Sequence, residues 1–282
     1  METKNAQGTK TTLVLGGTGK TGRRVVERLA ARGVLTRVGS RSGEPPFDWD
    51  DRTTWASALR DVESVYVSYY PDLAVPGAVA AVRSFAELAV EAGVRRLVLL
   101  SGRGEEEAQR AERAVQDAAA EWTVVRCAWF NQNFSENYLL EPMLGGEVAL
   151  PAGDVPEPFV DAEDIADVAV AALTEAGHAG ELYELTGSRL LTVKEAIGEI
   201  AWAAGREIRF VPVSVEEYAS VLAEQDVPAE FVTLLTYLFG EVLDGRNAYL
   251  TDGVRRVLGR EPRDFADYAR EAAAAGVWDG GR

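Results

Sequence analysis

The chain has 282 residues, of which 47% are hydrophobic and 26% charged, as in an ordinary soluble globular protein. Its formal net charge of −16 repels nucleic-acid phosphates, so we expect no direct nucleic-acid partner. No run of about 18 apolar residues occurs, so we expect no membrane span. The polar start METKNAQGTKTT lacks the apolar core of a signal peptide and predicts a short loose leader in a cytoplasmic protein.

Short apolar runs alternate with amphipathic segments through the first half of the chain. The predicted strands are 12–16, 34–40, 47–50, 64–70, 95–102 and 122–130, and the predicted helices are 23–33, 53–61, 77–92 and 104–119. Strands that alternate with helices of about 10–15 residues imply βαβ units, a parallel sheet and right-handed crossovers. The expected fold class is therefore α/β, with a Rossmann-type doubly wound parallel sheet.

The alternation loosens after residue 130. We expect a helix over 131–144, a helix capped by Asp161, a strand at 181–187, and helices over 192–204, 215–225, 228–243 and 263–275. These elements predict a Rossmann domain over 11–155, to which later segments return. Residues 156–282 would form a smaller, mixed C-terminal lobe on the substrate side, and not an independent domain.

The glycine-rich stretch after the first strand predicts a dinucleotide site. A buried strand precedes it and a helix follows, the context in which glycines allow a tight turn, close approach of a pyrophosphate, and helix–strand packing. The helix N-terminus adds amide donors and partial positive charge. The predicted binding residues are Gly16, Gly17, Thr18, Gly19, Lys20, Thr21 and Gly22. A P-loop is the competing interpretation, but it needs a glycine five positions before Gly19, where the chain has Val14.

The residues after the second strand favour NADP(H) as the cofactor, and NAD(H) stays open as the alternative. An NAD site usually carries an acidic residue there to bind the ribose hydroxyls. This chain has Ser40, Arg41 and Ser42 instead, and an arginine pairs well with a 2′-phosphate. Asp48 and Trp49 are placed to meet the edge and face of the adenine.

These residues resemble the NmrA-like, atypical short-chain dehydrogenase/reductase family. The matching stretches keep the family's order over nearly the whole chain: LVLGGTGKTG, ALRDVESVYVSY, WTVVRCAWFNQNF, PFVDAEDIADVAVAAL, LTGSRLLTVKEAIGEIAWAAGREIRF and GREPRDFADYA. The resemblance implies NAD(P)(H) binding and a small lobe that closes over the substrate. The family includes quinone, triphenylmethane-dye and aromatic-compound reductases. It also includes non-catalytic members that act as redox-sensing regulators.

One departure from the family pattern concerns acid–base chemistry. Short-chain dehydrogenases usually carry Tyr-x-x-x-Lys on the helix after the fifth strand. Aligning Glu112 with the glutamate that often follows this motif puts Ala108 at the lysine and Gly104 at the tyrosine, while Ser101 takes the serine-like position. One interpretation is a reductase of aromatic, quinone-like or conjugated acceptors, which need little acid help because charge delocalises over the ring. The alternative is a non-catalytic NADP(H)-binding regulator.

Candidate substrate-side residues follow the fourth and sixth strands. Tyr69, or its neighbour Tyr70, could stack on an aromatic ring or donate a phenolic proton. By the resemblance, the segment after the sixth strand meets the nicotinamide, and the amide of Asn131 could fix the carboxamide or a substrate carbonyl. The candidates in that segment are Trp129, Phe130, Asn131 and Asn133. The predicted catalytic residues are thus Tyr69, Ser101 and Asn131.

Other conspicuous residues have structural explanations. Aromatic residues at helical spacing favour core packing over a lid: Phe159, Tyr218, Phe231, Tyr237 and Phe239. The acidic cluster Asp161, Glu163 and Asp164 is typical of a helix start. His178 lies in a glycine-flanked loop and is expected to be exposed, and the single cysteine, Cys127, is expected in the core. We therefore expect no metal site.

The expected partner is a small aromatic or quinone-like molecule, and the sequence leaves a homodimer open. The Ala/Arg/Gly/Val-rich composition is associated with GC-rich bacteria, in which such proteins tailor aromatic secondary metabolites.

Overall fold

The computed structural model describes residues 11–280, so the predicted leader lies outside the described residues except for Thr11 and Thr12. The chain forms two compact units, and both are discontinuous in sequence. Among the described residues, unit 1 holds 11–101 together with Glu107–Val125 and Ala166–Tyr183. Unit 2 holds Gly102–Glu106, Arg126–Ile165 and the described residues from Glu184 to Gly280.

This division differs from the boundary predicted between residues 155 and 156. Residues 126–155 cluster with unit 2, whereas 166–183 return to unit 1. The chain crosses between units because the last helix and strand that complete the sheet come late in the sequence. No described helix is both long and apolar enough to span a bilayer.

A six-stranded sheet forms the framework of unit 1. Its strands are β1 (Thr11–Leu15), β2 (Thr36–Gly39), β3 (Val62–Val67), β4 (Arg96–Gly102), β5 (Glu121–Cys127) and β8 (Glu181–Leu185), in the order β2-β1-β3-β4-β5-β8. β1 pairs in parallel with β2 and β3, and β3 with β4. The chain runs from β1 outward to β2 and returns past β1 to β3, so the strand order reverses at β1.

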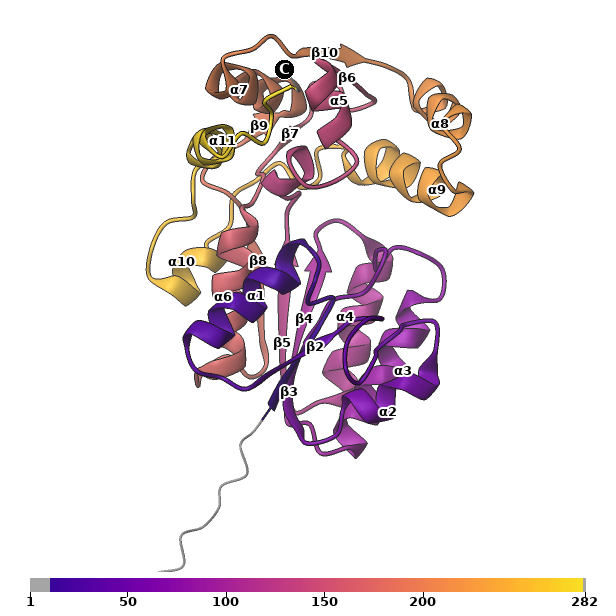
Figure 1. Ribbon diagram of the computed structural model, residues 1–282, viewed down its shortest axis with the longest axis vertical. Coiled ribbons are helices and arrows are strands. Elements are labelled where there is room, and N and C mark those ends of the chain that lie inside the picture. Colours follow the sequence, from indigo (N-terminus) through magenta and orange to yellow (C-terminus); the bar gives the residue numbers. More distant parts are fainter. Residues whose placement is uncertain (1–10, 281–282) are drawn as a thin grey trace, which may run out of the picture. The chain divides into compact units, whose positions relative to one another are not determined.

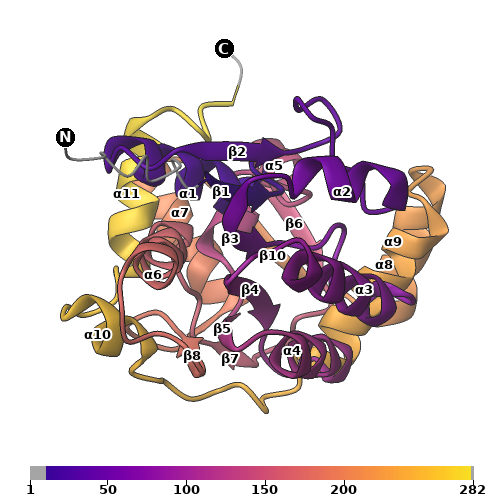
Figure 2. The ribbon, with the colours of Figure 1, turned by 90° about the horizontal axis from the view of Figure 1, so that it is seen from below.

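Helices cover both faces of this sheet, which confirms the predicted doubly wound α/β fold. They are α1 (Lys20–Ala31), α2 (Trp55–Ala58), α3 (Ala78–Glu91), α4 (Glu106–Ala118) and α6 (Ala162–Thr174). Figures 1 and 2 show α1 and α6 on one face and α2, α3 and α4 on the other. Strands buried on both faces must be apolar throughout, as every residue of β1 is buried.

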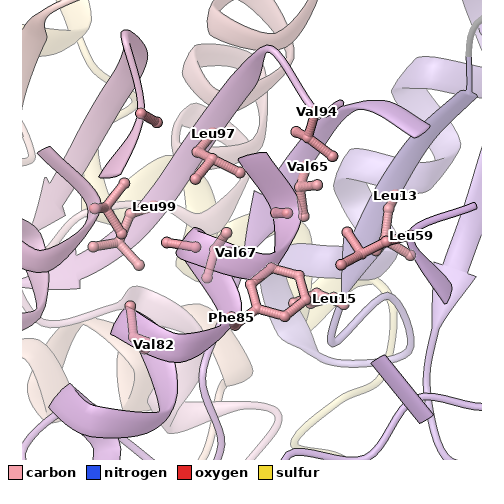
Figure 3. Close-up of a cluster of buried hydrophobic side chains, with 14 of the residues drawn as sticks. Leu13, Leu15, Leu59, Val65, Val67, Val82, Phe85, Val94, Leu97 and Leu99 are labelled. Atoms are coloured by element: carbon pink, nitrogen blue, oxygen red, sulfur yellow. The ribbon is translucent and has the colours of Figure 1, made fainter. Parts of the chain in front are cut away.

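The core of unit 1 lies between the sheet and the helices α2, α3 and α4. Alternate residues of neighbouring strands point to this face and meet the apolar side of α3, as the close-up in Figure 3 shows. The labelled side chains are Leu13, Leu15, Leu59, Val65, Val67, Val82, Phe85, Val94, Leu97 and Leu99.

The predicted third strand at 47–50 is wrong. The segment is a turn, in which the Asp48 carboxylate accepts from the backbone N–H of Asp50 at 3.1 Å. Its apolar pattern comes instead from Phe47, which is buried against Trp55 and Phe85. The predicted helix over 53–61 shrinks to a 3-10 turn at Arg52–Thr54 followed by α2.

Unit 2 is built from short elements around a second core. They are a 3-10 turn (Asn131–Phe134), α5 (Leu140–Gly145), β6 (Glu147–Leu150), β7 (Pro156–Glu157), β9 (Leu191–Thr192), α7 (Val193–Ala204), β10 (Arg209–Pro212), α8 (Val215–Glu224), α9 (Ala229–Tyr237), a π-helical turn (Leu238–Val242), α10 (Gly253–Leu258) and α11 (Phe265–Ala274). β6 pairs in parallel with β10, and β7 antiparallel with β9.

The single helix predicted over 131–144 is broken in two. Proline is tolerated in the first turn of a helix but not in its interior, and Pro142 lies in the first turn of α5. Further upstream, the Gln132 side chain bonds to the Asp161 carboxylate and to the backbone N–H of Ala162, which fixes the 3-10 turn separately. α10 and β10 were not predicted.

Candidate functional site

The glycine-rich turn lies at the carboxyl end of β1, where the strand order reverses. Gly16 has φ +64°, a conformation that favours glycine, and its N–H donates to the Gly39 carbonyl at 3.0 Å. The N–H of Gly19 then donates back to the Gly16 carbonyl at 2.8 Å. This turn lies at the position where open α/β sheets bind nucleotides.

Gly22 allows α1 to pack directly on the turn. A Cβ at this position would lie 2.1 Å from the carbonyl oxygen of Gly16, a distance that no side chain tolerates. A Cβ on Gly17 would approach Val38 to 2.9 Å. At Gly19, by contrast, it would meet only the Gly16 oxygen at 3.2 Å, and Gly19 is exposed. The backbone is therefore open to an approaching ligand at Gly19.

The first turn of α1 presents backbone donors. Gly19 is its N-cap, no side chain caps it, and the first turn holds no acidic residue. Thr18 is exposed and Lys20 half-buried, whereas Thr21 is buried and turned inward, because its hydroxyl oxygen accepts from the Tyr66 phenol at 2.9 Å. These features suit a dinucleotide pyrophosphate held mainly by main-chain amides.

The segment after β2 carries an arginine, Arg41, whose guanidinium has no partner among the described residues. The Ser40 carbonyl accepts from Gly43 and Phe47, which shapes the loop. Arg41 is exposed, and within residues 11–280 its guanidinium makes no hydrogen bond or ion pair. The hydroxyl oxygens of Ser40 and Ser42 lie 3.4 Å apart. A guanidinium that no carboxylate engages is free to bind an anionic ligand.

Trp49 and Tyr69 come together at the carboxyl end of β3. The Trp49 indole donates to the Ser68 carbonyl at 3.1 Å, and its ring lies 4.9 Å from that of Tyr69. Burial, helped by the charge of Asp50, raises the pKa of the Tyr69 phenol, so it stays protonated at neutral pH. A Cβ on Gly16 would lie 3.4 Å from the Ser68 hydroxyl, so Ser68 is a neighbour of the glycine turn that the sequence analysis missed.

The predicted catalytic Ser101 is already engaged. It is buried at the end of β4, and its hydroxyl donates to the carboxylate of buried Glu112 at 2.6 Å. Ala108, aligned with the usual lysine, is buried too. Gly104, aligned with the usual tyrosine, has φ +77°, and a Cβ there would lie 2.5 Å from the side-chain nitrogen of Asn247. Gly104 therefore leaves no room for a larger side chain unless Asn247 moves.

In unit 2, an aromatic cluster is centred on Phe239. The Trp129 ring centroid is 4.8 Å from that of Phe239, and Phe239 also contacts Tyr138 at 6.5 Å and Tyr218 at 5.6 Å. Burial raises the pKa of Tyr218 to about 12. We call these four residues the aromatic cluster. Phe239 lies in the π-helical turn, a local structure often found at functional sites.

Asn131, the first residue of the 3-10 turn in unit 2, has an unsatisfied polar side chain. It is fully buried, and within the described residues neither its amide nitrogen nor its amide oxygen has a hydrogen-bond partner. Its backbone N–H donates to Val160, and the preceding Phe130 forms a bridge with the same residue. Buried amides are normally satisfied, so this side chain suits a ligand or water.

The remaining candidates are structural. Asp161 accepts from the N–H of Glu163 at the start of α6, and Asp164 is buried and paired with Arg260 at 2.7 Å. His178 is half-buried and not exposed as expected, because its ring bonds to the Tyr183 phenol at 2.9 Å. Cys127 is buried, which raises the pKa of its thiol. No group of three or more His, Cys, Asp or Glu residues in 11–280 could hold a metal ion.

Two buried charged residues of unit 2 that carry unsatisfied polar atoms escaped the sequence analysis. Arg103 follows β4 and Glu157 lies in β7, and both carry polar atoms without a hydrogen-bond partner among the described residues. The ring of Tyr249 covers the Arg103 guanidinium at 4.4 Å. No motif marks either position, because their burial depends on segments far apart in the sequence.

Comparisons with known proteins agree with this geometry. A family model described as NAD(P)H-binding matches residues 16–176. The chain is 30% identical to the NAD(P)H azoreductase of Xenophilus azovorans, over 93% of this chain and 98% of that protein. It is 32% identical to a (4-alkanoyl-5-oxo-2,5-dihydrofuran-3-yl)methyl phosphate reductase of Streptomyces griseus, over 93% and 98%.

The fold is also similar to that of solved structures. An NADPH-dependent quinone oxidoreductase of Escherichia coli, in complex with NADPH, matches with a TM-score of 0.77 at 21% identity, over 92% of this chain and 99% of that chain. The chain therefore belongs to the family described as NAD(P)H-binding, and its relatives of 30% identity or more include named reductases.

Proposed function

We propose that this protein transfers hydride from NADPH to an aromatic, quinone-like or otherwise conjugated acceptor. The observation that carries the choice of cofactor is Arg41, an exposed guanidinium without a protein partner within residues 11–280, at the end of the strand that usually carries an acid in NAD-dependent enzymes. The flanking Ser40 and Ser42 hydroxyls can add donors to a 2′-phosphate. The open backbone at Gly19 and the uncapped start of α1 support pyrophosphate binding.

The packing around the usual catalytic positions supports a conjugated acceptor. A simple ketone needs an acid at its oxygen while hydride arrives, and Gly104 and Ala108 supply none. A quinone or azo group spreads the incoming charge over its π system and depends less on an acid. The reduced nicotinamide, when bound, supplies the hydride, and positioning then provides most of the acceleration.

The aromatic cluster of unit 2 and the unsatisfied amide of Asn131 support the same acceptor class. Offset or edge contacts with rings such as Trp129 would stabilise a flat ligand. The Asn131 amide would donate to a carbonyl oxygen. Relatives named as an azoreductase and a quinone oxidoreductase agree with a planar acceptor. Tyr69 of unit 1, whose phenol stays protonated, remains a proposed ligand contact.

Turnover with a panel of acceptors tests this proposal. Purified protein is mixed with NADPH and, separately, with substituted quinones, an azo dye and an unconjugated ketone, while loss of the reduced nicotinamide absorbance is followed. We expect turnover with the conjugated acceptors and none with the ketone. The control is Gly19→Val, in which a side chain on the exposed face of the loop should prevent cofactor binding.

Two results would contradict the proposal in different ways. Tight NADPH binding without turnover of any acceptor would favour the non-catalytic redox-sensing regulator. Unchanged NADPH binding in Gly19→Val would instead show that the glycine loop is not the cofactor site.

A further inference from the structure

Glu157 carries a buried carboxyl group, and one of its two oxygens has no hydrogen-bond partner among the described residues. It is 1% exposed, in β7, where it pairs with Leu191 of β9. The backbone N–H of Trp129 donates to the carboxylate. Its Oε1 has no hydrogen-bond partner among the described residues. A buried charged oxygen without a donor is costly, whereas a protonated one can itself donate to a ligand.

The groups that face Glu157 set the pKa of its carboxyl near neutral pH. Burial raises the pKa of the Glu157 carboxyl to about 7, and the positive charge of Arg103 limits the rise. Its neighbour β9 contributes only Leu191 and Thr192, neither of which titrates. Glu184 lies 3.7 Å from the Arg103 Nε and is itself paired with Arg126 at 2.8 Å. Burial therefore keeps a substantial share of the Glu157 carboxyl groups protonated near neutral pH.

Trp129 connects Glu157 to the aromatic cluster. Its backbone donates to the carboxylate, while its ring packs against Phe239. The other acids of that region are weaker, since burial raises the pKa of Tyr218 to about 12 and also raises that of Cys127. General acids work best when their pKa lies near the working pH, which among these groups singles out Glu157.

We propose that Glu157 donates the proton that a quinone-like or azo acceptor needs when it is reduced, directly or through one water. This inference rests on the proposed function. The acceptor gains two electrons as hydride and binds a proton at its oxygen or nitrogen. The Oε1–H bond of Glu157 breaks, an O–H or N–H bond forms on the acceptor, and the carboxylate regains a proton from solvent. No oxidant or reductant beyond NADPH and the acceptor is needed.

Arg103 is the positioning residue for this step. It is 3% exposed, and its Nε and Nη2, which lie on the same edge of the guanidinium, have no hydrogen-bond partner within residues 11–280. That edge is the one that binds a carboxylate through two parallel bonds. The positive charge of Arg103, although shared with Glu184 at 3.7 Å, therefore stabilises the carboxylate that Glu157 leaves behind, which makes proton loss easier.

Infrared titration tests the protonation directly, without cofactor or acceptor. We expect the full-length protein to show a carboxylic-acid C=O band that disappears with a midpoint near pH 7. Glu157→Gln should lack this band, and Glu224→Gln, a change at an exposed glutamate, should keep it. Arg103→Met should move the midpoint to higher pH, because the cation holds the pKa of Glu157 down.

The pH dependence of kcat at saturating acceptor tests the role in turnover. A donor must hold its proton, so kcat should fall as pH rises through the pKa of Glu157. Glu157→Gln should lower kcat by about 10²-fold, the lower end of the usual contribution of a general acid, because a conjugated acceptor depends less on an acid. It should also lose this limb of the profile. In Arg103→Met the limb should move to higher pH, a displacement that a purely structural defect would not cause.

The outcomes separate this inference from the function on which it rests. If Glu157→Gln keeps the wild-type kcat and pH profile, Glu157 is not the donor, although the reductase function stands. If the carboxylic-acid band is absent at pH 5–6, the buried proton does not exist and the inference fails. If the wild-type protein reduces no acceptor, both proposals fail, and the titration still reports the protonation of Glu157.

Discussion

Two glycines of the same loop have different neighbours, so substitutions at them should have different consequences. At Gly22 a methyl group would lie 2.1 Å from the Gly16 carbonyl, so Gly22→Ala must push α1 away from the turn. At Gly19 the same methyl meets only one atom at 3.2 Å and otherwise points to exposed space. We expect Gly22→Ala to lower the thermal midpoint and to weaken NADPH binding.

Gly19→Ala should instead leave the midpoint close to that of the wild type and weaken binding alone. Thermal melts without ligand and titrations with NADPH measure the two effects separately. Equal loss of stability in both variants would contradict the assignment of Gly19 to the ligand-facing side of the loop.

Arg41 should determine the preference between the two cofactors. Its guanidinium has no competing partner within the described residues, so its binding capacity is available to a 2′-phosphate. A charge-assisted hydrogen bond is worth roughly 1.5–3 kcal/mol. Arg41→Ala should therefore lower the NADPH/NADH ratio of kcat/KM by roughly 10- to 100-fold. Arg60→Ala removes the same charge from another exposed site and serves as the control. If Arg41→Ala leaves the NADPH/NADH ratio of kcat/KM unchanged, residues other than Arg41 bind the 2′-phosphate.

At the scale of elements, the sequence predicted long periodic segments well. β1, α1, α3 and α4 were predicted within about three residues at each end, because burial on one or both faces imposes a clear apolar pattern. The segment at 47–50 failed because Phe47 is apolar for a different reason, its packing among the aromatic side chains of α2 and α3.

The candidate site divides in the same way. The glycine loop and Arg41 could be predicted because their spacing along the chain reflects a local backbone mechanism. Arg103 and Glu157 could not, because they belong to segments more than 50 residues apart, and their burial arises only when these segments pack together. Asn131 was predicted from its position after a strand, but its unsatisfied amide is visible only in the structure.

α7 and the start of α11 are joined by one arginine in unit 2. Arg189 binds the Glu199 carboxylate through two bonds of 2.6 and 2.7 Å and the Asp264 carboxylate through bonds of 2.9 and 3.0 Å. Asp264 also caps α11 by accepting from Ala266. These hydrogen bonds, chiefly those from Arg189, hold the pKa of Asp264 well below its usual range.

Arg189→Ala should therefore destabilise the protein in a pH-dependent way. A carboxyl whose pKa is lowered on folding adds stability above its unfolded pKa of about 4, and this stability is lost as pH falls further. The thermal midpoint of Arg189→Ala should lie below that of the wild type at pH 7, and the gap should narrow below about pH 4. Arg255→Ala, which breaks an exposed pair with Glu261, should change the midpoint little. A gap that stays constant from pH 7 to pH 3 would show that Arg189 acts through packing alone.

At the scale of the whole molecule, the net negative charge of the protein repels the anionic cofactor NADPH. The chain has 45 acidic and 29 basic residues, so its field repels an anionic dinucleotide at long range. Local donors, namely the loop amides and Arg41, act only after the ligand has come close. Long-range repulsion slows association, whereas short-range pairing slows dissociation. Salt should therefore change the association rate by screening the net charge of the protein, and the dissociation rate by screening the contact with Arg41.

We therefore expect the association rate of NADPH to rise when salt is increased from about 10 mM to 150 mM, as the screening length falls from about 30 to 8 Å. The rise should be smaller for NADH, which lacks the 2′-phosphate and its negative charge of about 1.5 to 2. The dissociation rate of NADPH should also increase with salt, because screening weakens its contact with Arg41, and this increase should be lost in Arg41→Ala. Stopped-flow measurement of tryptophan fluorescence gives both rates, and uncharged sucrose at matched viscosity is the control. An association rate that falls with salt would mean that a local positive field at the glycine loop outweighs the net charge of −16 during approach.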